Sequence, residues 1–115
     1  MTEKIIGAFY RVYNSLGFGL SEKTYGNAMA LEFENVGLKF VREVPLNVVY
    51  MGKKVGEYFA DFIVEDVIVE LKAVRELCGV EDQQILNYLK VGGFEVGLVL
   101  NFGTKAQVRR KIRSR

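Results

Sequence analysis

The hydrophobic residues of the first third of the chain recur at helical spacing. Positions one, three and four apart carry Ile5, Ile6, Phe9, Val12, Tyr13 and Leu16. This pattern predicts an amphipathic helix over Ile5–Leu16, ended by Gly17-Phe18-Gly19. A second helix is expected from Ser21 to Val36, stopping at Gly37, and a third from about Glu81 to Val91, stopping at Gly92-Gly93.

Between and after these helices the pattern changes to short runs rich in β-branched and aromatic residues. The runs predict strands at Phe40–Val44, Leu46–Met51, Val55–Val64, Val67–Lys72 and Val96–Leu100, with Pro45 and Gly52 as breaks. The alternation of Ala106, Val108, Arg110 and Ile112 favours an edge strand over a helix. The order of elements predicts a single domain over residues 1–115 of the α/β (α+β) class, a sandwich around a mixed sheet.

The strand pair around Glu65-Asp66 carries the strongest chemical signal. If Val64 pairs with Val67 across that short loop, Asp61 lies directly opposite Glu70. Opposed side chains share a face about 4.5–5.5 Å apart, and two like charges there destabilise a sheet. A divalent cation between them would reverse that penalty. Lys72, two residues beyond Glu70, projects from the same face.

Two alternatives to this interpretation stay open. Glu-Asp is not a preferred two-residue hairpin turn, and an odd-length loop would shift the register by one. The charged residues could also form a solvated polar face. Against that, Phe59, Ile63 and Ile68 fall on the face of the acids, while the opposite face carries only apolar residues, namely Phe62, Val64, Val67, Val69 and Leu71. Both faces are therefore expected to be at least partly covered, where unpartnered charges are costly.

The amino-acid composition limits the kinds of protein and of active site that the chain could form. Half of the 115 residues are hydrophobic and 26% are charged, which is typical of one folded domain. No apolar run approaches a membrane span, no signal-peptide pattern is present, and Cys78 is the single cysteine, so we expect a cytoplasmic protein. The chain has no histidine, which excludes histidine-based nucleophilic catalysis and nearly every zinc site. Any metal would need hard oxygen ligands, as Mg²⁺, Mn²⁺ or Ca²⁺ do.

Charge is distributed unevenly. The last eleven residues hold six of the 16 basic residues and none of the 14 acidic ones, which leaves ten bases against fourteen acids in the rest of the chain. The six are Lys105, Arg109, Arg110, Lys111, Arg113 and Arg115. A basic tail beside an acidic body suits a protein that contacts phosphate backbones. A solubilising tail or a charged edge strand explains the same pattern.

Four further polar residues lie on predicted helices. Glu22 shares a helix face with Tyr25, Met29 and Glu32, and it could complete an acidic site or simply favour the helix N-terminus. Glu32 is the weaker candidate. Gln84 and Tyr88 stand four apart, beside a core stripe; they are either boundary residues or groups that bind a phosphate or position water.

An ordered set of motifs now makes the chain resemble a known family. The set comprises Gly19-Leu20-Ser21-Glu22-Lys23-Thr24-Tyr25, Val44-Pro45-Leu46, Ala60-Asp61, Val69-Glu70-Leu71-Lys72, Gln84 to Tyr88, and Leu100-Asn101-Phe102. It is similar to the GxxExxY family of the PD-(D/E)XK nuclease-like superfamily, and it covers nearly the whole chain. The resemblance implies a restriction-endonuclease-like core, a mixed sheet flanked by helices. Ala60 replaces the nominal proline before the first acid.

The resemblance also implies roles for individual residues. Asp61, Glu70 and the main-chain carbonyl of Leu71 would hold Mg²⁺ (or Mn²⁺), and Glu22 matches a helical acid that completes many such sites. Lys72 is the lysine of the motif, and Gln84 and Tyr88 match a helical polar pair. The implied activity is metal-dependent hydrolysis of phosphodiester bonds in nucleic acid, with DNA preferred over RNA. Two alternatives remain: a non-catalytic nucleic-acid-binding module, and a protein-interaction subunit such as a homodimer.

Overall fold

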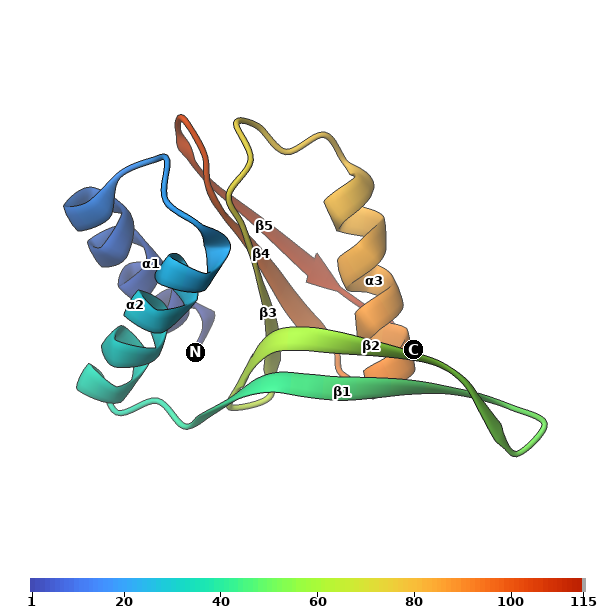
Figure 1. Ribbon diagram of the computed structural model, residues 1–115. Coiled ribbons are helices and arrows are strands. Elements are labelled where there is room, and N and C mark those ends of the chain that lie inside the picture. The colour runs from blue at the N-terminus through green and yellow to red at the C-terminus, as the bar shows by residue number, and fades with distance from the viewer. Residues whose placement is uncertain (115) are drawn as a thin grey trace.

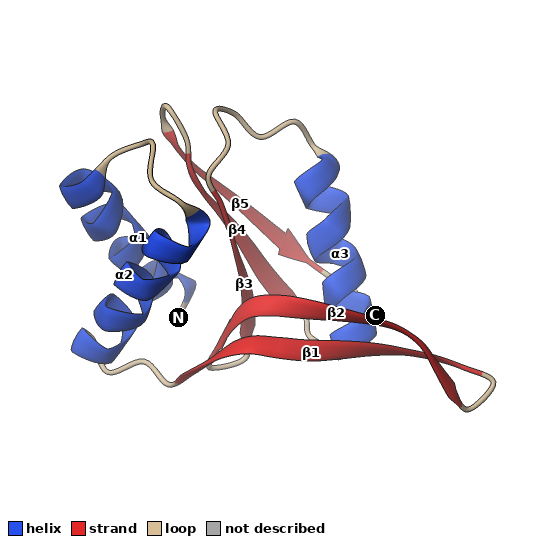
Figure 2. Cartoon of the chain, viewed as in Figure 1, coloured by secondary structure: helices blue, strands red, loops and turns tan. Residues whose placement is uncertain are grey.

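The computed structural model describes residues 1–114 as a five-stranded mixed sheet with helices on both faces (Figures 1 and 2). The strands are β1 (Phe40–Tyr50), β2 (Lys53–Val64), β3 (Val67–Lys72), β4 (Val96–Phe102) and β5 (Ala106–Ile112). They follow in the order β1-β2-β3-β4-β5, and only the β3–β4 pair is parallel. The predicted α+β fold is confirmed. The mixed sheet with its flanking helices is consistent with a restriction-endonuclease-like core.

The three helices agree with the hydrophobic pattern to within a few residues. They are α1 (Thr2–Leu16), α2 (Glu22–Asn35) and α3 (Val80–Gly92). The Ser21 hydroxyl caps α2 by accepting a hydrogen bond from the Thr24 amide at 3.1 Å. Gly93 ends α3 in the left-handed conformation that glycine adopts without strain. None of the described helices is long and apolar enough to cross a membrane.

One predicted break in the strands is wrong. The sequence pattern separates Phe40–Val44 from Leu46–Met51 at Pro45, yet β1 runs through that proline, which pairs with Phe59 of β2. Because β1 is the edge strand of the sheet, a residue without an N–H is tolerated there.

Side chains on the two faces of the sheet form separate hydrophobic cores. Under α1 and α2, the core includes Tyr25, Met29, Phe33, Phe62, Val64, Val67, Val69, Leu71 and Leu100. Under α3, it includes Leu46, Ala60, Ile68, Ile85, Leu89 and Val99, with Ile63 packed against it. The predicted face of Phe62, Val64, Val67, Val69 and Leu71 is therefore confirmed. Phe59, however, is 53% exposed and belongs to neither core.

The hairpin of β1 and β2 extends well beyond the rest of the sheet (Figure 1). Backbone pairing between β2 and β3 covers only Phe62, Ile63 and Val64 of β2, whereas β1 and β2 stay paired out to Tyr50 and Lys53. Strands β2 and β3 therefore separate at Asp61. The candidate site lies at this point of separation, which we call the parting.

Candidate functional site at the parting of two strands

The predicted register of the β2–β3 hairpin is confirmed. Val64 pairs with Val67, Ile63 with Ile68 and Phe62 with Val69, so the next step of the series sets Asp61 opposite Glu70. At that step the backbone amides bond to carboxylate side chains and not to the backbone of the neighbouring strand. The Asp61 amide donates to Glu70 Oε2 at 3.0 Å, and the Leu71 amide donates to Asp61 Oδ2 at 2.8 Å. The two acids are thus interlocked across the point where the strands part.

The alternation of β2 breaks at Asp61. Ala60 packs in the core under α3, whereas Phe62, two residues on, packs in the core under α1 and α2. Arg42 pairs with Phe62 and Val44 with Ala60, so the ladder between β1 and β2 skips Glu43 and Asp61. Glu43 has a φ of 52°, which is uncommon for a residue other than glycine. This irregularity turns Asp61 away from a simple inward or outward position. Its carboxylate can therefore face α2 while it still accepts the amide of Leu71.

Glu70 lies in the more buried environment of the two acids. Its exposed fraction is 5%. Burial, followed by the hydrogen bond and the negative charge of Asp61, raises the pKa of Glu70 to about 9, and the nearby ammonium of Lys72 opposes this only weakly. A carboxyl of this kind stays protonated near neutral pH unless positive charge arrives beside it.

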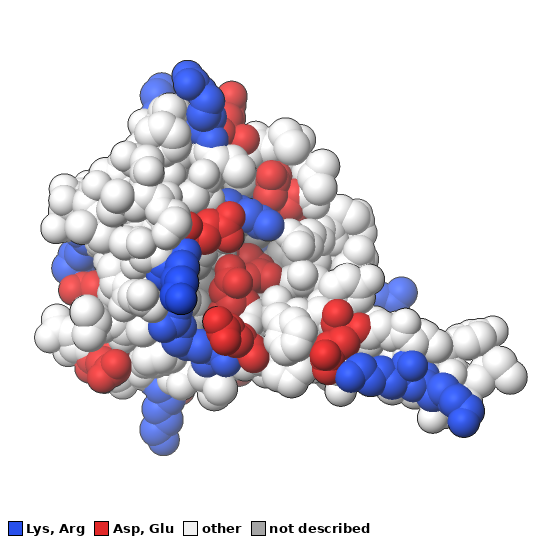
Figure 3. Space-filling view, in the orientation of Figure 1, with Lys and Arg blue, Asp and Glu red and all other residues white. Residues whose placement is uncertain are grey.

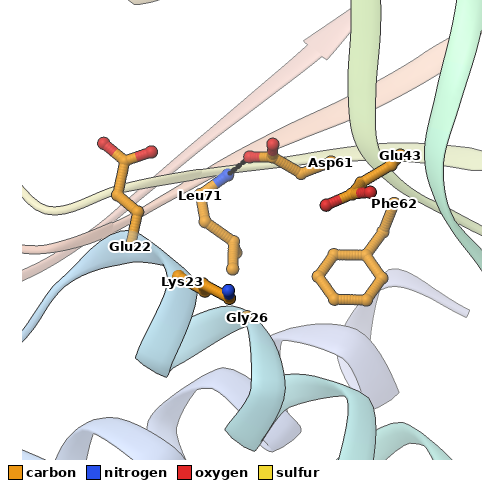
Figure 4. Close-up of a pocket in the computed structure, with 7 residues that line it drawn as sticks. All are labelled: Glu22, Lys23, Gly26, Glu43, Asp61, Phe62 and Leu71. Atoms are coloured by element: carbon orange, nitrogen blue, oxygen red, sulfur yellow. Dashed lines mark hydrogen bonds between the residues drawn. The ribbon is translucent and has the colours of Figure 1, made fainter.

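Asp61 also lines a cavity of about 260 Å³ between the hairpin and the first turns of α2 (Figure 4). The other lining residues are Glu22, Lys23, Gly26, Glu43, Phe62 and Leu71. The close-up shows Glu22 rising from the start of α2 on one side, with Asp61 and Glu43 together on the other. The space-filling view shows acidic side chains gathered in this hollow between the α1–α2 pair and the hairpin (Figure 3).

Sequence reasoning included Glu22 in the site but missed Glu43. The signal for Glu43 would have been the pairing of β1 with β2, because Glu43 and Asp61 lie between the same two pairs, Arg42 with Phe62 and Val44 with Ala60. Among residues 1–114, no group of three or more Asp, Glu, His or Cys side chains lies close enough together to hold a metal ion.

Lys72 and the helical pair lie on the α3 side of the parting. Lys72, Gln84 and Tyr88 all line a groove of about 760 Å³ between α3 and the hairpin. The Gln84 amide donates to the Tyr88 hydroxyl at 3.1 Å. Burial raises the pKa of Tyr88, as does the neighbouring charge of Glu70. The pair therefore faces the Glu70 side of the site.

Two other members of the predicted α2 stripe have structural roles. Glu32 accepts a hydrogen bond from the Arg11 guanidinium at 2.6 Å, so it joins α2 to α1 away from the acidic cavity. The Tyr25 hydroxyl donates to the Gly17 carbonyl at 2.5 Å and accepts from the Leu20 amide at 3.1 Å, while its ring stacks on Phe102 at 4.0 Å. Tyr25 therefore fixes the loop that sets the start of α2, and with it the position of Glu22.

A polar network fixes the loop that follows Lys72. Asn101 is fully buried at the end of β4; its side chain accepts from the Val74 amide at 3.1 Å and donates to the Val74 carbonyl at 3.0 Å. It also donates to Gln107 of β5, whose side-chain oxygen accepts from the Leu77 amide. In the sequence, Asn101 was notable only as part of the motif Leu100-Asn101-Phe102. Its role is to hold the chain as it leaves β3.

The basic tail forms the predicted edge strand, β5, two strands away from β3. Part of its charge is neutralised internally, since Arg109 and Lys111 lie 3.4 and 3.6 Å from the Asp82 carboxylate on α3. The Arg113 guanidinium donates to the Phe94 carbonyl at 3.2 Å. Arg115, the last residue of the predicted tail, lies outside the described residues.

A sequence model described as the PD-(D/E)XK nuclease superfamily matches residues 1–113. The chain belongs to this superfamily. Membership indicates phosphodiester chemistry of the nuclease type and contact with nucleic acid, and proteins of this superfamily typically use divalent metals. No curated protein and no solved structure matches the chain.

Proposed function

We propose that this protein is a metal-dependent nuclease that hydrolyses phosphodiester bonds in DNA, and that it belongs to the GxxExxY group within its superfamily. The observation that carries the proposal is the interlocked pair of Asp61 and Glu70, with Lys72 two residues further along β3. The match to a nuclease superfamily over residues 1–113 supports it.

The chemistry of the donor set fits Mg²⁺ or Mn²⁺. Both metals prefer oxygen ligands, and Asp61 and Glu70 offer carboxylate oxygens at one place. In an extended strand the N–H and C=O of one residue point to the same edge, so the carbonyl of Leu71 faces Asp61 as its amide does. We therefore assign Asp61, Glu70 and the Leu71 carbonyl as the ligands. Glu22, across the cavity from Asp61, does not lie close enough to both acids to act as a third direct ligand, and it would instead orient a water molecule.

When bound, such a cation polarises a phosphoryl oxygen and lowers the pKa of water. The protein's own groups supply the rest. Glu70, whose pKa is about 9 without a cation, would release its proton on binding and become an ionised ligand. Lys72 would stabilise the charge that develops on the phosphoryl oxygens, since no acidic side chain of the described residues forms an ion pair with it. Gln84 would hold the Tyr88 hydroxyl toward the same place.

Cleavage of labelled DNA and RNA, each single-stranded and double-stranded, tests the proposal with Mg²⁺, Mn²⁺ or EDTA. The wild type should cleave DNA only with a metal, and both Glu70→Gln and Lys72→Met should abolish cleavage while circular dichroism shows an unchanged fold. Matched controls are Glu34→Gln and Lys4→Met, which change exposed helical residues outside the site and should cleave normally. Cleavage that persists in both site variants would refute the assignment.

A further inference from the structure

The groove that Lys72 shares with α3 differs sharply in chemistry from the acidic cavity. The groove has a volume of about 760 Å³. The residues that line it are Val48, Tyr58, Lys72, Val80, Gln83, Gln84, Asn87, Tyr88, Lys90 and Val91. It opens because β2 leaves β3 at Asp61, so the hairpin beyond that point faces α3 without a strand beside it (Figure 1).

No carboxylate lines this groove, whereas the cavity on the other side of the parting is lined by three carboxylates and one ammonium, that of Lys23, so its charge is negative on balance. The groove instead contains the ammonium groups of Lys72 and Lys90 and the amides of Gln83, Gln84 and Asn87. A polyanion that reaches the site is therefore repelled on one side and attracted on the other. Charge complementarity selects the groove as the path of the nucleic-acid backbone.

Two tyrosine rings give the groove an aromatic wall. Tyr58 of β2 and Tyr88 of α3 have their ring centroids 5.9 Å apart. Tyr88 is almost buried, whereas Tyr58 is 51% exposed, so Tyr58 offers a free face to a ligand in the groove. Aromatic rings stack on nucleobases of any sequence, and side-chain amides can pair with base edges.

We infer that this groove binds single-stranded nucleic acid, with one base stacked on Tyr58 and the adjoining phosphate beside Lys72. In a duplex each base face is already covered by its neighbours, so Tyr58 can contribute only when bases are unstacked. Lys90 of α3 contacts the backbone further along the groove, and Asn87 lies three residues before it on the same helix. The inference deepens the proposed function and rests on it for the role of Lys72, but the binding itself needs no cleavage.

Fluorescence anisotropy in EDTA measures this binding apart from catalysis. The probes are a short labelled DNA strand and a duplex of equal length, at one fixed low salt concentration. The wild type should bind the single strand more tightly. Tyr58→Ala should lose about 5- to 150-fold in affinity for the single strand, which is the usual effect of removing one stacked base, with little change for the duplex. Tyr58→Phe should restore the binding, because the ring and not the hydroxyl makes the contact.

Two comparisons make this test selective. Tyr50→Ala removes a tyrosine that is even more exposed than Tyr58 and lies at the far end of the hairpin, outside the groove; this variant should bind as the wild type does. Asn87→Ala changes an exposed position on α3, tests the groove without altering the hairpin, and should weaken single-strand binding.

The outcomes separate the inference from the proposed function. Equal affinity for both probes, equal losses for both in Tyr58→Ala, or no binding of either at low salt would overturn the groove assignment, and the last result would favour a protein ligand. Selective single-strand binding without cleavage in Mg²⁺ or Mn²⁺ would support the groove and refute the nuclease. Cleavage by a Tyr58→Ala variant with unchanged single-strand affinity would do the reverse.

Discussion

Replacing Glu70 with glutamine should stabilise the metal-free protein, and increasingly so as the pH rises. The substitution keeps the shape of the side chain and an oxygen that can accept the Asp61 amide, but it removes the ionisable group. Burial and Asp61 raise the pKa of Glu70 from its ordinary value of 4.5 to about 9. The folded chain therefore retains a proton that the unfolded chain releases between these two values.

The sign and size follow from proton linkage. A raised carboxyl pKa gives a contribution that is fully present below 4.5 and is lost as the pH rises toward 9, because only the unfolded chain can ionise freely over that range. At about pH 7.5, roughly three units above the ordinary value, each unit corresponds to about 1.4 kcal/mol, which sets a limit of about 4 kcal/mol. Since Asp61 shares in the titration of the pair, we expect a gain of about 2–4 kcal/mol for Glu70→Gln.

Urea denaturation in EDTA, followed by circular dichroism at several pH values between about 5 and 9, measures this difference. The free energy of unfolding of the wild type should fall relative to that of Glu70→Gln across the range. The control, Glu34→Gln, removes an exposed carboxylate from α2 and should stay within about 0.5 kcal/mol of the wild type. Parallel curves for the wild type and Glu70→Gln would refute the reasoning, because they would mean that Glu70 ionises in the folded state without penalty.

The same denaturation experiment can be repeated with a metal ion in place of EDTA. At the alkaline end, Mn²⁺ should raise the stability of the wild type by about 2.7 kcal/mol at a concentration 100 times its dissociation constant. Glu70→Gln should gain much less, because one of the two carboxylate ligands is gone. An equal gain in both proteins would place the metal elsewhere.

Four further substitutions test the supports of the site by their free energies of unfolding. Gly103→Ala should cost about 1–3 kcal/mol, because an added Cβ would lie 2.6 Å from the Arg75 carbonyl oxygen. Gly7→Ala should be neutral or stabilising, because its added Cβ would contact only the Arg11 side chain, at an ordinary 3.5 Å, and alanine favours the helix. Asn101→Ala should cost about 2–3 kcal/mol, since it leaves buried polar groups without partners, and hydrogen exchange should speed up at the Val74 amide. Tyr25→Phe should cost about 1–2 kcal/mol by removing the hydroxyl that joins two loop residues to α2, and unchanged stability would mean that this loop holds itself in place.

The register of the β2–β3 hairpin was predictable because its two apolar runs are centred on Glu65-Asp66, although a loop of odd length would have shifted it by one residue. The turn itself was not, since Glu65 is an unusual residue for a φ of 56°. The structure explains it through a contact distant in sequence. The Glu65 amide donates to the Lys39 carbonyl, and its carboxylate accepts from the Lys39 amide, each at 2.9 Å. A tertiary contact therefore replaces the local preference for asparagine or glycine.

Other features depended on neighbours that periodicity does not specify. Pro45 reads as a break in any isolated strand and is tolerated only because β1 became an edge. The charge of the tail reads as free, yet Asp82 lies against Arg109 and Lys111 because α3 crosses the sheet beside β5. Asp61 was placed on the face of Glu70 by strict alternation, whereas the break between Ala60 and Phe62 turned it toward α2.

The contacts of the acidic pair decide which substitutions can reveal their chemistry. Because β2 and β3 part at Asp61, the amides of Asp61 and Leu71 are bonded to the carboxylates of Glu70 and Asp61. Alanine at either acid would remove the acceptor of a partly buried N–H along with the ligand, and an unmade bond of this kind costs about 1–3 kcal/mol. An inactive alanine variant would then not distinguish a lost metal ligand from strands that had separated further. Asp61→Asn and Glu70→Gln keep the acceptors and remove only the ability to ionise. Loss of cleavage in these two variants, with the fold unchanged, is therefore the result that assigns the carboxylates to catalysis.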